Sequence, residues 1–107
     1  MAFWPVKVVR HLVYVVAVNY VKEGCLDEFL AIGRTLVEET NKNDAGCVSY
    51  GMYQDTQNPL VVTVLEQWES EEALQNHLNS RHFLDAIPKL HSLCDRPGSV
   101  SVYKKLF

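Results

Sequence analysis

The stretch "LVVTVLEQWESEEALQNHLNSRHF", Leu60–Phe83, contains the change from strand to helix that decides the fold. Its first nine residues are rich in β-branched side chains, which predicts a strand over 60–68. Ser70 then stands at an N-cap position, and Glu71 and Glu72 in the first turn favour the positive end of the helix dipole. The apolar stripe of this helix is formed by Ala73, Leu74, His77 and Leu78. A histidine thus lies where an aliphatic residue is expected.

Two further strands are predicted upstream. "CVSYGMYQD" alternates apolar and small or polar residues, and "TQNP" after it has the composition of a turn. Cys47–Asp55 and Leu60–Trp68 are therefore expected to form an antiparallel hairpin. "HLVYVVAVNYV", His11–Val21, is β-branched and aromatic almost throughout, which predicts a strand buried on both faces.

The remaining segments complete the pattern. "CLDEFLAIGRTLVEETNKN", residues 25–43, has a regular apolar stripe and predicts an amphipathic helix, ended by Gly46 in a left-handed conformation. A second helical piece is expected over 82–93, kinked or split by Pro88. "DRPG" is predicted to break the chain before a last strand, "SVSVYKKLF".

The order β-α-β-β-α-β predicts an α+β, ferredoxin-like fold, a four-stranded antiparallel sheet with helices on one face. A single domain is expected over 1–107, with its core at about 10–105 and a short N-terminal extension over 1–9. The face away from the helices is not wholly polar, because it carries Tyr53, Val61, Thr63 and Leu65. Such a patch is a liability in a monomer, so we expect a homodimer formed through the open sheet face.

Composition excludes several classes of function. A net charge of −3 provides no basic stripe for nucleic acid. The longest apolar stretch, residues 12–18, is far shorter than the ~20 residues of a membrane-spanning helix. We recognise no signal peptide, and three widely spaced cysteines suggest reduced thiols. These features predict a cytoplasmic protein that binds neither nucleic acid nor membranes.

His77 is the main candidate for a functional residue. A buried imidazole without a partner costs about 1–3 kcal/mol, so it needs a hydrogen bond or a role. Glu66 and Trp68 share the helix-facing side of the preceding strand, and Tyr50 is expected on the same face. Together they would form a proton-handling pocket. His82, near the junction of two helical pieces, is a further candidate, although a lone buried histidine is more often a satisfied core residue.

No motif for a nucleotide or a metal is present. The chain has no GxGxxG segment, P-loop, HExxH or nucleophile elbow. We therefore expect neither an organic cofactor nor a metal.

Three blocks of this sequence resemble the antibiotic biosynthesis monooxygenase (ABM) domain family, which includes quinol monooxygenases. They are "KEGCLDEFL", "AGCVSYGMYQD" and, most specifically, "LEQWESEEALQNHLNSRHF". The resemblance implies a dimeric α/β barrel made of two ferredoxin-like subunits. It also implies a pocket between sheet and helices in which O₂ oxidises a quinol or polycyclic phenol without a cofactor.

On this resemblance, His77 or Glu66 handles the substrate proton. The residues implied to bind the ring are Trp68, Tyr50, His82, Phe83, Met52 and Val64. Two other functions are compatible with the same fold: a non-redox isomerase of a small metabolite, and a non-catalytic dimer that binds a ligand or takes part in a stress response. An apolar pocket lining favours aromatic rings over polar metabolites.

Overall fold

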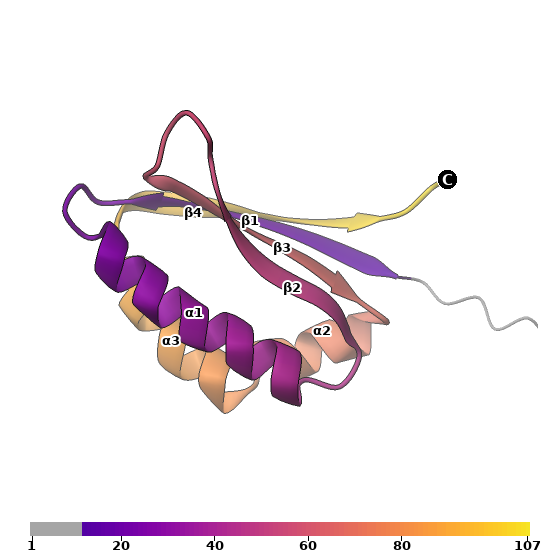
Figure 1. The fold of residues 1–107 in the computed structure, drawn as a ribbon. Helices are drawn as coiled ribbons and strands as arrows, with labels where there is room; N and C mark the ends of the chain where they lie inside the picture. Colours follow the sequence, from indigo (N-terminus) through magenta and orange to yellow (C-terminus); the bar gives the residue numbers. More distant parts are fainter. Residues whose placement is uncertain (1–11) are drawn as a thin grey trace, which may run out of the picture.

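The structure, a computed structural model, describes residues 12–107. It has one antiparallel sheet with the strand order β2-β3-β1-β4, and three helices along one face of that sheet (Figure 1). The elements in chain order are β1 (Val13–Val21), α1 (Leu26–Asn43), β2 (Cys47–Gln54), β3 (Val61–Trp68), α2 (Glu71–Leu78), α3 (Arg81–Ser92) and β4 (Cys94–Lys104). The predicted ferredoxin-like fold is confirmed, with the second helical unit divided into α2 and α3. The N-terminal extension 1–9 and His11 lie outside the described residues.

β2 and β3 form the predicted hairpin, in a register that places Tyr50 opposite Glu66. Asp55 holds the turn, because its carboxylate accepts hydrogen bonds from backbone N–H groups two and three residues later, at 2.8 and 2.9 Å. These bonds stabilise the ionised form and hold the pKa of Asp55 below its usual value. The even-numbered residues face the helices throughout β3 and from Tyr50 onward in β2, whereas a register shift at the start of β2 places Cys47 opposite Trp68.

The helices pack on the sheet through the stripes expected from the sequence. The buried residues of α1 are Phe29, Gly33, Leu36 and Thr40. Gly33 leaves room for the Met52 side chain of β2 to pack against α1, since a Cβ at position 33 would lie 2.5 Å from the methionine sulfur. The predicted cap of α2 is confirmed: Ser70 Oγ accepts a hydrogen bond from the backbone N–H of Ala73 at 3.1 Å.

α3 runs from Arg81 to Ser92 without a break, so the predicted split at Pro88 does not occur. Proline lacks an N–H and removes one helical hydrogen bond, here the bond to the carbonyl of Leu84. Pro88 and Leu84 are both exposed, so water can bond to the freed carbonyl.

β4 begins at Cys94 and ends at Lys104, so the prediction that "DRPG" breaks the chain is wrong. β4 is an edge strand paired only with β1, and Pro97 can therefore lie in it without interrupting a second ladder. Gly98 allows the backbone of β4 to lie close to that of β1, because a Cβ at this position would lie 2.0 Å from the carbonyl oxygen of Val18. The β1–β4 register shifts between Val18 and Val21, which absorbs the irregular segment.

The helix layer covers the start of β4 but leaves its C-terminal half uncovered. On the helix-facing side, Val15 of β1 is 4% exposed, whereas its neighbour Val102 on β4 is 57% exposed and Val100 is 71% exposed. We call the pair Val100 and Val102 the open strip. It provides an apolar surface that leads inward to the buried residues of β1 and β3.

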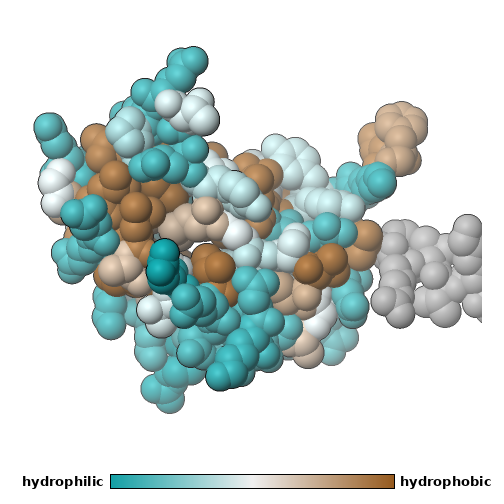
Figure 2. Space-filling model, viewed as in Figure 1, coloured by the Kyte–Doolittle hydropathy of each residue, from teal (hydrophilic) through white to brown (hydrophobic). Residues whose placement is uncertain are grey.

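The opposite face of the sheet has no covering element within residues 12–107. Its large exposed side chains include Tyr53, Leu65 and Tyr103. The outer side of the helix layer, by contrast, is mostly hydrophilic (Figure 2). This difference agrees with the predicted apolar open face, and the dimer inferred from it stays a prediction.

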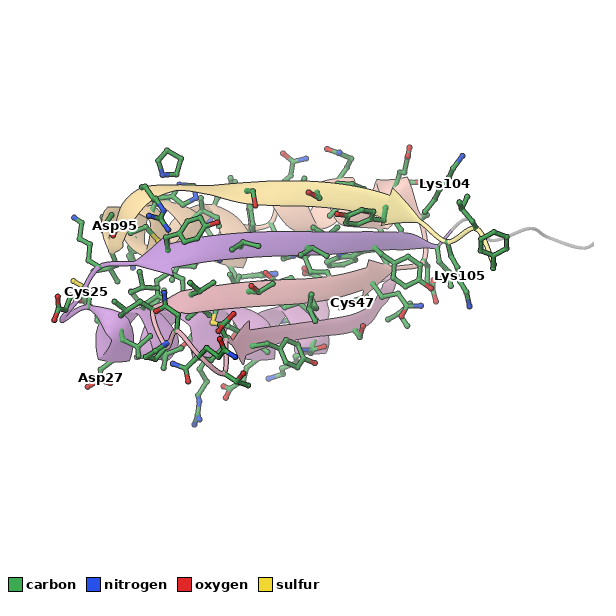
Figure 3. The ribbon with its side chains drawn as sticks, turned by 90° about the horizontal axis from the view of Figure 1, so that it is seen from above. Cys25, Asp27, Cys47, Asp95, Lys104 and Lys105 are labelled. Atoms are coloured by element: carbon green, nitrogen blue, oxygen red, sulfur yellow. The ribbon has the colours of Figure 1, made fainter. Side chains whose placement is uncertain are left out.

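The cysteines do not form disulfides with one another. Cys25, Cys47 and Cys94 are free and half-buried. Cys25 and Cys47 lie at opposite ends of the sheet (Figure 3). None of the three helices within residues 12–107 has the length and apolarity that a membrane crossing requires.

Candidate functional site

Asp44, His77 and His82 meet at one end of the helix layer. Asp44 is the C-cap residue of α1, His77 lies in the last turn of α2, and His82 lies in the first turn of α3. His77 Nδ1 lies 2.5 Å from Asp44 Oδ2, and His82 Nε2 lies 2.9 Å from Asp44 Oδ1. The second contact has ion-pair distance but is not aligned as a hydrogen bond. One carboxylate therefore lies between two imidazoles.

The His77 ring is buried among other rings. Its centroid lies 4.8 Å from that of Trp68, 4.9 Å from that of Phe83 and 5.1 Å from that of Tyr50. His77 is 1% exposed, and its Nε2 has no hydrogen-bond partner among the described residues. Burial lowers the pKa of His77; the hydrogen bond and negative charge of Asp44 oppose this shift, and His82 adds to it.

Glu66 lies on the helix-facing side of the sheet, as Trp68 does, and comes two residues before the end of β3. Its Oε1 accepts a hydrogen bond from Trp68 Nε1 at 2.8 Å. Burial raises the pKa of Glu66, and the bond from Trp68 only partly opposes this shift. Glu66 is half-buried, so in contrast to His77 it can be reached from outside the core.

The residues around Glu66 are otherwise apolar or aromatic. In the sheet it lies between Tyr50 on β2 and Val15 on β1, and Val15 is followed by Val102 of the open strip. Burial raises the pKa of Tyr50, and the negative charge of Glu66 raises it further, so its hydroxyl stays protonated. Glu66 is thus the carboxylate in a row that leads from the aromatic cluster to the open strip.

The structure brings most of the predicted residues together. Rings of Tyr50, Trp68, His82 and Phe83 surround His77, and Glu66 joins this cluster through Trp68. The other two residues lie further along the sheet, where Met52 pairs with Val64 and packs on α1 at Gly33. Their placement is that of core residues between sheet and helix.

Two of the hollows bordered by residues 12–107 have neither His77 nor Glu66 in their walls. One, of about 450 Å³, is a groove between α1 and α3 with His82 in its wall. The other, of about 530 Å³, lies beside the irregular part of β4 and includes His91 and Cys94. His82 therefore connects the buried Asp44 to the groove on the outer side of the helix layer.

Asp44 was not singled out by the sequence patterns. It lies in "NDAG", which indicates a helix end, and nothing in its spacing connects it to residues more than thirty positions later. It also completes the one group within residues 12–107 that can hold a metal ion, with ligand atoms of Asp44, His77 and His82 all within 4.8 Å of one another. Residue spacing along the chain does not reveal this group, because Asp44 follows α1 whereas His77 and His82 lie in α2 and α3.

Residues 12–89 match the family model described as antibiotic biosynthesis monooxygenase. An uncharacterized protein of Synechocystis sp., sll1783, is 31% identical over 84 residues, which cover 78% of this chain. The chain spans only 56% of the length of that relative.

Solved structures show the same fold. A conserved protein from Methanosarcina mazei Go1 is 37% identical, with a TM-score of 0.87 over 91% of this chain and 95% of its own. The crystal structure of an antibiotic biosynthesis monooxygenase is 26% identical, with a TM-score of 0.83 over 88% of this chain and 98% of its own.

Proposed function

We propose a function from one established premise: this chain belongs to the antibiotic biosynthesis monooxygenase (ABM) family. We infer that it is a cofactor-independent monooxygenase that oxidises a quinol or polycyclic phenol with O₂. The observation that carries this inference is Glu66, a half-buried carboxylate with a raised pKa in an apolar row that opens at β4. A base of this kind suits the removal of a phenolic proton.

Glu66 is a better proton acceptor than His77. Either residue was expected to handle the proton, but His77 is fully buried and its Nδ1 is occupied by Asp44. A substrate can reach Glu66 along the open strip without displacing the aromatic cluster. Trp68 holds the carboxylate in place by its indole N–H, so the second carboxylate oxygen is left for the substrate hydroxyl.

The apolar surface provides a place for the rings. A flat substrate lying against Val102, with Phe83 as its wall on the helix side, would direct its hydroxyl across β1 toward Glu66. Tyr50 remains a hydroxyl donor beside the carboxylate, because its pKa is raised. Burial of fused rings on such a surface contributes about 25 cal/mol per Å² of apolar area.

The reaction needs only this base and O₂. Glu66 takes the phenolic proton, the phenolate gives one electron to O₂, and the two radicals combine to form a C–O bond. The proton returns to give a hydroperoxide. Glu66 then removes the C–H proton while the O–O bond breaks, and it protonates the departing hydroxide. One phenol and one O₂ thus give one quinone and one water, and Glu66 ends ionised as it began.

Oxygen uptake with a panel of reduced naphthoquinols and naphthols tests this function. We expect uptake above autoxidation, with water rather than hydrogen peroxide as the reduced product. Glu66→Gln should lower kcat by about 10²–10⁴-fold, because the amide keeps the shape but cannot accept a proton. His91→Gln, on the exposed side of α3, is the matched control and should leave the rate unchanged.

Two results would refute the proposal. Uptake that is equal in the wild type and in Glu66→Gln would show that the carboxylate has no part in it. Binding of the aromatic ring without turnover, detected by quenching of tryptophan fluorescence, would identify a non-catalytic ligand-binding protein.

We also propose that the protein forms a homodimer through the open sheet face. Tyr53, Leu65 and Tyr103 support this proposal, because each is a large side chain more than 40% exposed. A contiguous apolar patch of this kind favours association.

A further inference from the structure

We propose that Asp44, His77 and His82 form a binding site for a divalent first-row transition-metal ion of the Zn²⁺ class. The site lies apart from Glu66 and goes beyond the proposed oxygenase. Its test measures metal binding directly, so it does not depend on turnover.

The donor set and its geometry carry the inference. Two imidazoles and one carboxylate are ligands that Zn²⁺ and similar ions accept. The three ligand atoms lie within 4.8 Å of one another, with 2.5 and 2.9 Å separating Asp44 from the two histidines. Two ligand atoms of a tetrahedral Zn²⁺ lie about 3.3 Å apart, so the widest separation must close by at most about 1.5 Å, while the Asp44 carboxylate moves slightly away from the two imidazoles.

The unpaired nitrogen of His82 supports the same inference. Asp44 can satisfy His77 Nδ1, but His82 Nε2 is buried and has no aligned hydrogen bond. A buried polar atom without a partner is costly, by about 1–3 kcal/mol. A cation between the three side chains would satisfy His82 Nε2, His77 Nδ1 and the Asp44 carboxylate together.

The surroundings provide both rigidity and access. The His77 ring is fixed by Trp68, Tyr50 and Phe83, so its Nδ1 is held toward Asp44. His82 borders the groove of about 450 Å³ between α1 and α3. Three protein ligands with solvent close by match the pattern of zinc sites that keep one position open for water. The ion would therefore exchange with solvent through this groove.

The groove and its neighbourhood contain other groups that a metal could meet. The charged side chains of the groove are Glu39, Arg81, Asp85 and Lys89. Their charges balance, so the groove neither attracts nor repels a cation strongly. Cys47 follows Asp44 by three residues and is half-buried, so a thiol must be excluded as the ligand.

The experiment is a titration of the full chain with Zn²⁺ by calorimetry after treatment with EDTA, repeated with Co²⁺ to record the absorption spectrum. We compare the wild type with Asp44→Asn and His82→Ala. The first substitution is isosteric, and the second replaces a partly exposed side chain, so both variants should fold. His91→Ala is the matched control, since it removes an exposed imidazole from α3 outside the cluster. Cys47→Ser controls for thiol binding.

We expect one Zn²⁺ per chain in the wild type, His91→Ala and Cys47→Ser. The Kd should rise at least about tenfold in Asp44→Asn and in His82→Ala. Removal of a residue that only hydrogen-bonds to a metal ligand already weakens binding by about 10–100-fold. The Co²⁺ spectrum should lack a thiolate band, and Zn²⁺ should raise Tm in the wild type more than in His82→Ala. Absence of binding, or equal Kd values in all five proteins, would overturn the proposal. A loss confined to Cys47→Ser would assign the metal to the thiol and overturn it as well.

Discussion

We expect the contact between His77 and Asp44 to make a large contribution to the free energy of unfolding. Both side chains are almost fully buried, with 0% and 9% of the side chain exposed, and their atoms lie 2.5 Å apart. A hydrogen bond to a charged group is worth about 1.5–3 kcal/mol. His77→Leu keeps the helix face apolar but leaves the carboxylate without its aligned donor. We expect it to lower the free energy of unfolding by about 1.5–3 kcal/mol.

A double-mutant cycle separates the contact from changes in packing. Asp44→Asn, His77→Leu and the double variant are compared by urea unfolding at pH 7.5, with EDTA present so that no metal contributes. The double variant no longer contains an unpaired carboxylate. Its loss should therefore be smaller than the sum of the single losses by at least about 1 kcal/mol.

His91→Leu serves as the control, because an exposed substitution on α3 should change stability by less than about 0.5 kcal/mol. If His77→Leu were as stable as the wild type, His77 would be an ordinary core position. Additive single losses would show equally well that Asp44 and His77 are not energetically coupled.

Three further predictions concern other parts of the molecule. Because burial raises the pKa of Glu66, the rate of quinol oxidation should rise with pH through that raised pKa, at a pH above the usual range for glutamate. The same shift means that the folded state binds this proton more tightly than the unfolded state, so stability is lost as pH rises through the raised pKa. Urea unfolding at pH 5 and pH 8 measures this loss, and Glu66→Gln should remove it. Gly98→Ala should cost about 1–3 kcal/mol, since its Cβ would meet the Val18 carbonyl at 2.0 Å, whereas Gly33→Ala meets only a flexible methionine and should cost less in the same assay. Leu65→Lys, on the open sheet face, should shift the protein from dimer to monomer in sedimentation, and an unchanged mass would contradict the proposed interface.

Local sequence signals account for most of the fold. The hairpin from 47 to 68, the stripe of α1 and the Ser70 cap each follow from residues next to one another in the chain, and all three were confirmed. The errors came where tertiary context changed the meaning of a local signal. Pro88 is tolerated because it lies on the exposed side of α3, and Pro97 is tolerated because β4 is an edge strand. Neither fact can be known before the sheet order is known.

The candidate site could be predicted from the sequence only in part, because its contacts join residues that are far apart in the chain. A histidine on an apolar stripe indicated that His77 needed a partner, and Glu66 and Trp68 were the nearest candidates along the chain. The partner is instead Asp44, brought there because α1 ends at Asn43 beneath the start of β2, opposite the C-terminal turn of α2. Trp68 then separates two polar groups: its ring packs on His77 at 4.8 Å, and its N–H binds Glu66 at 2.8 Å. The residues that sequence patterns joined into a single proton-handling pocket thus divide into an accessible carboxylate, Glu66, and a buried histidine, His77, that is paired with Asp44, and each requires its own experiment.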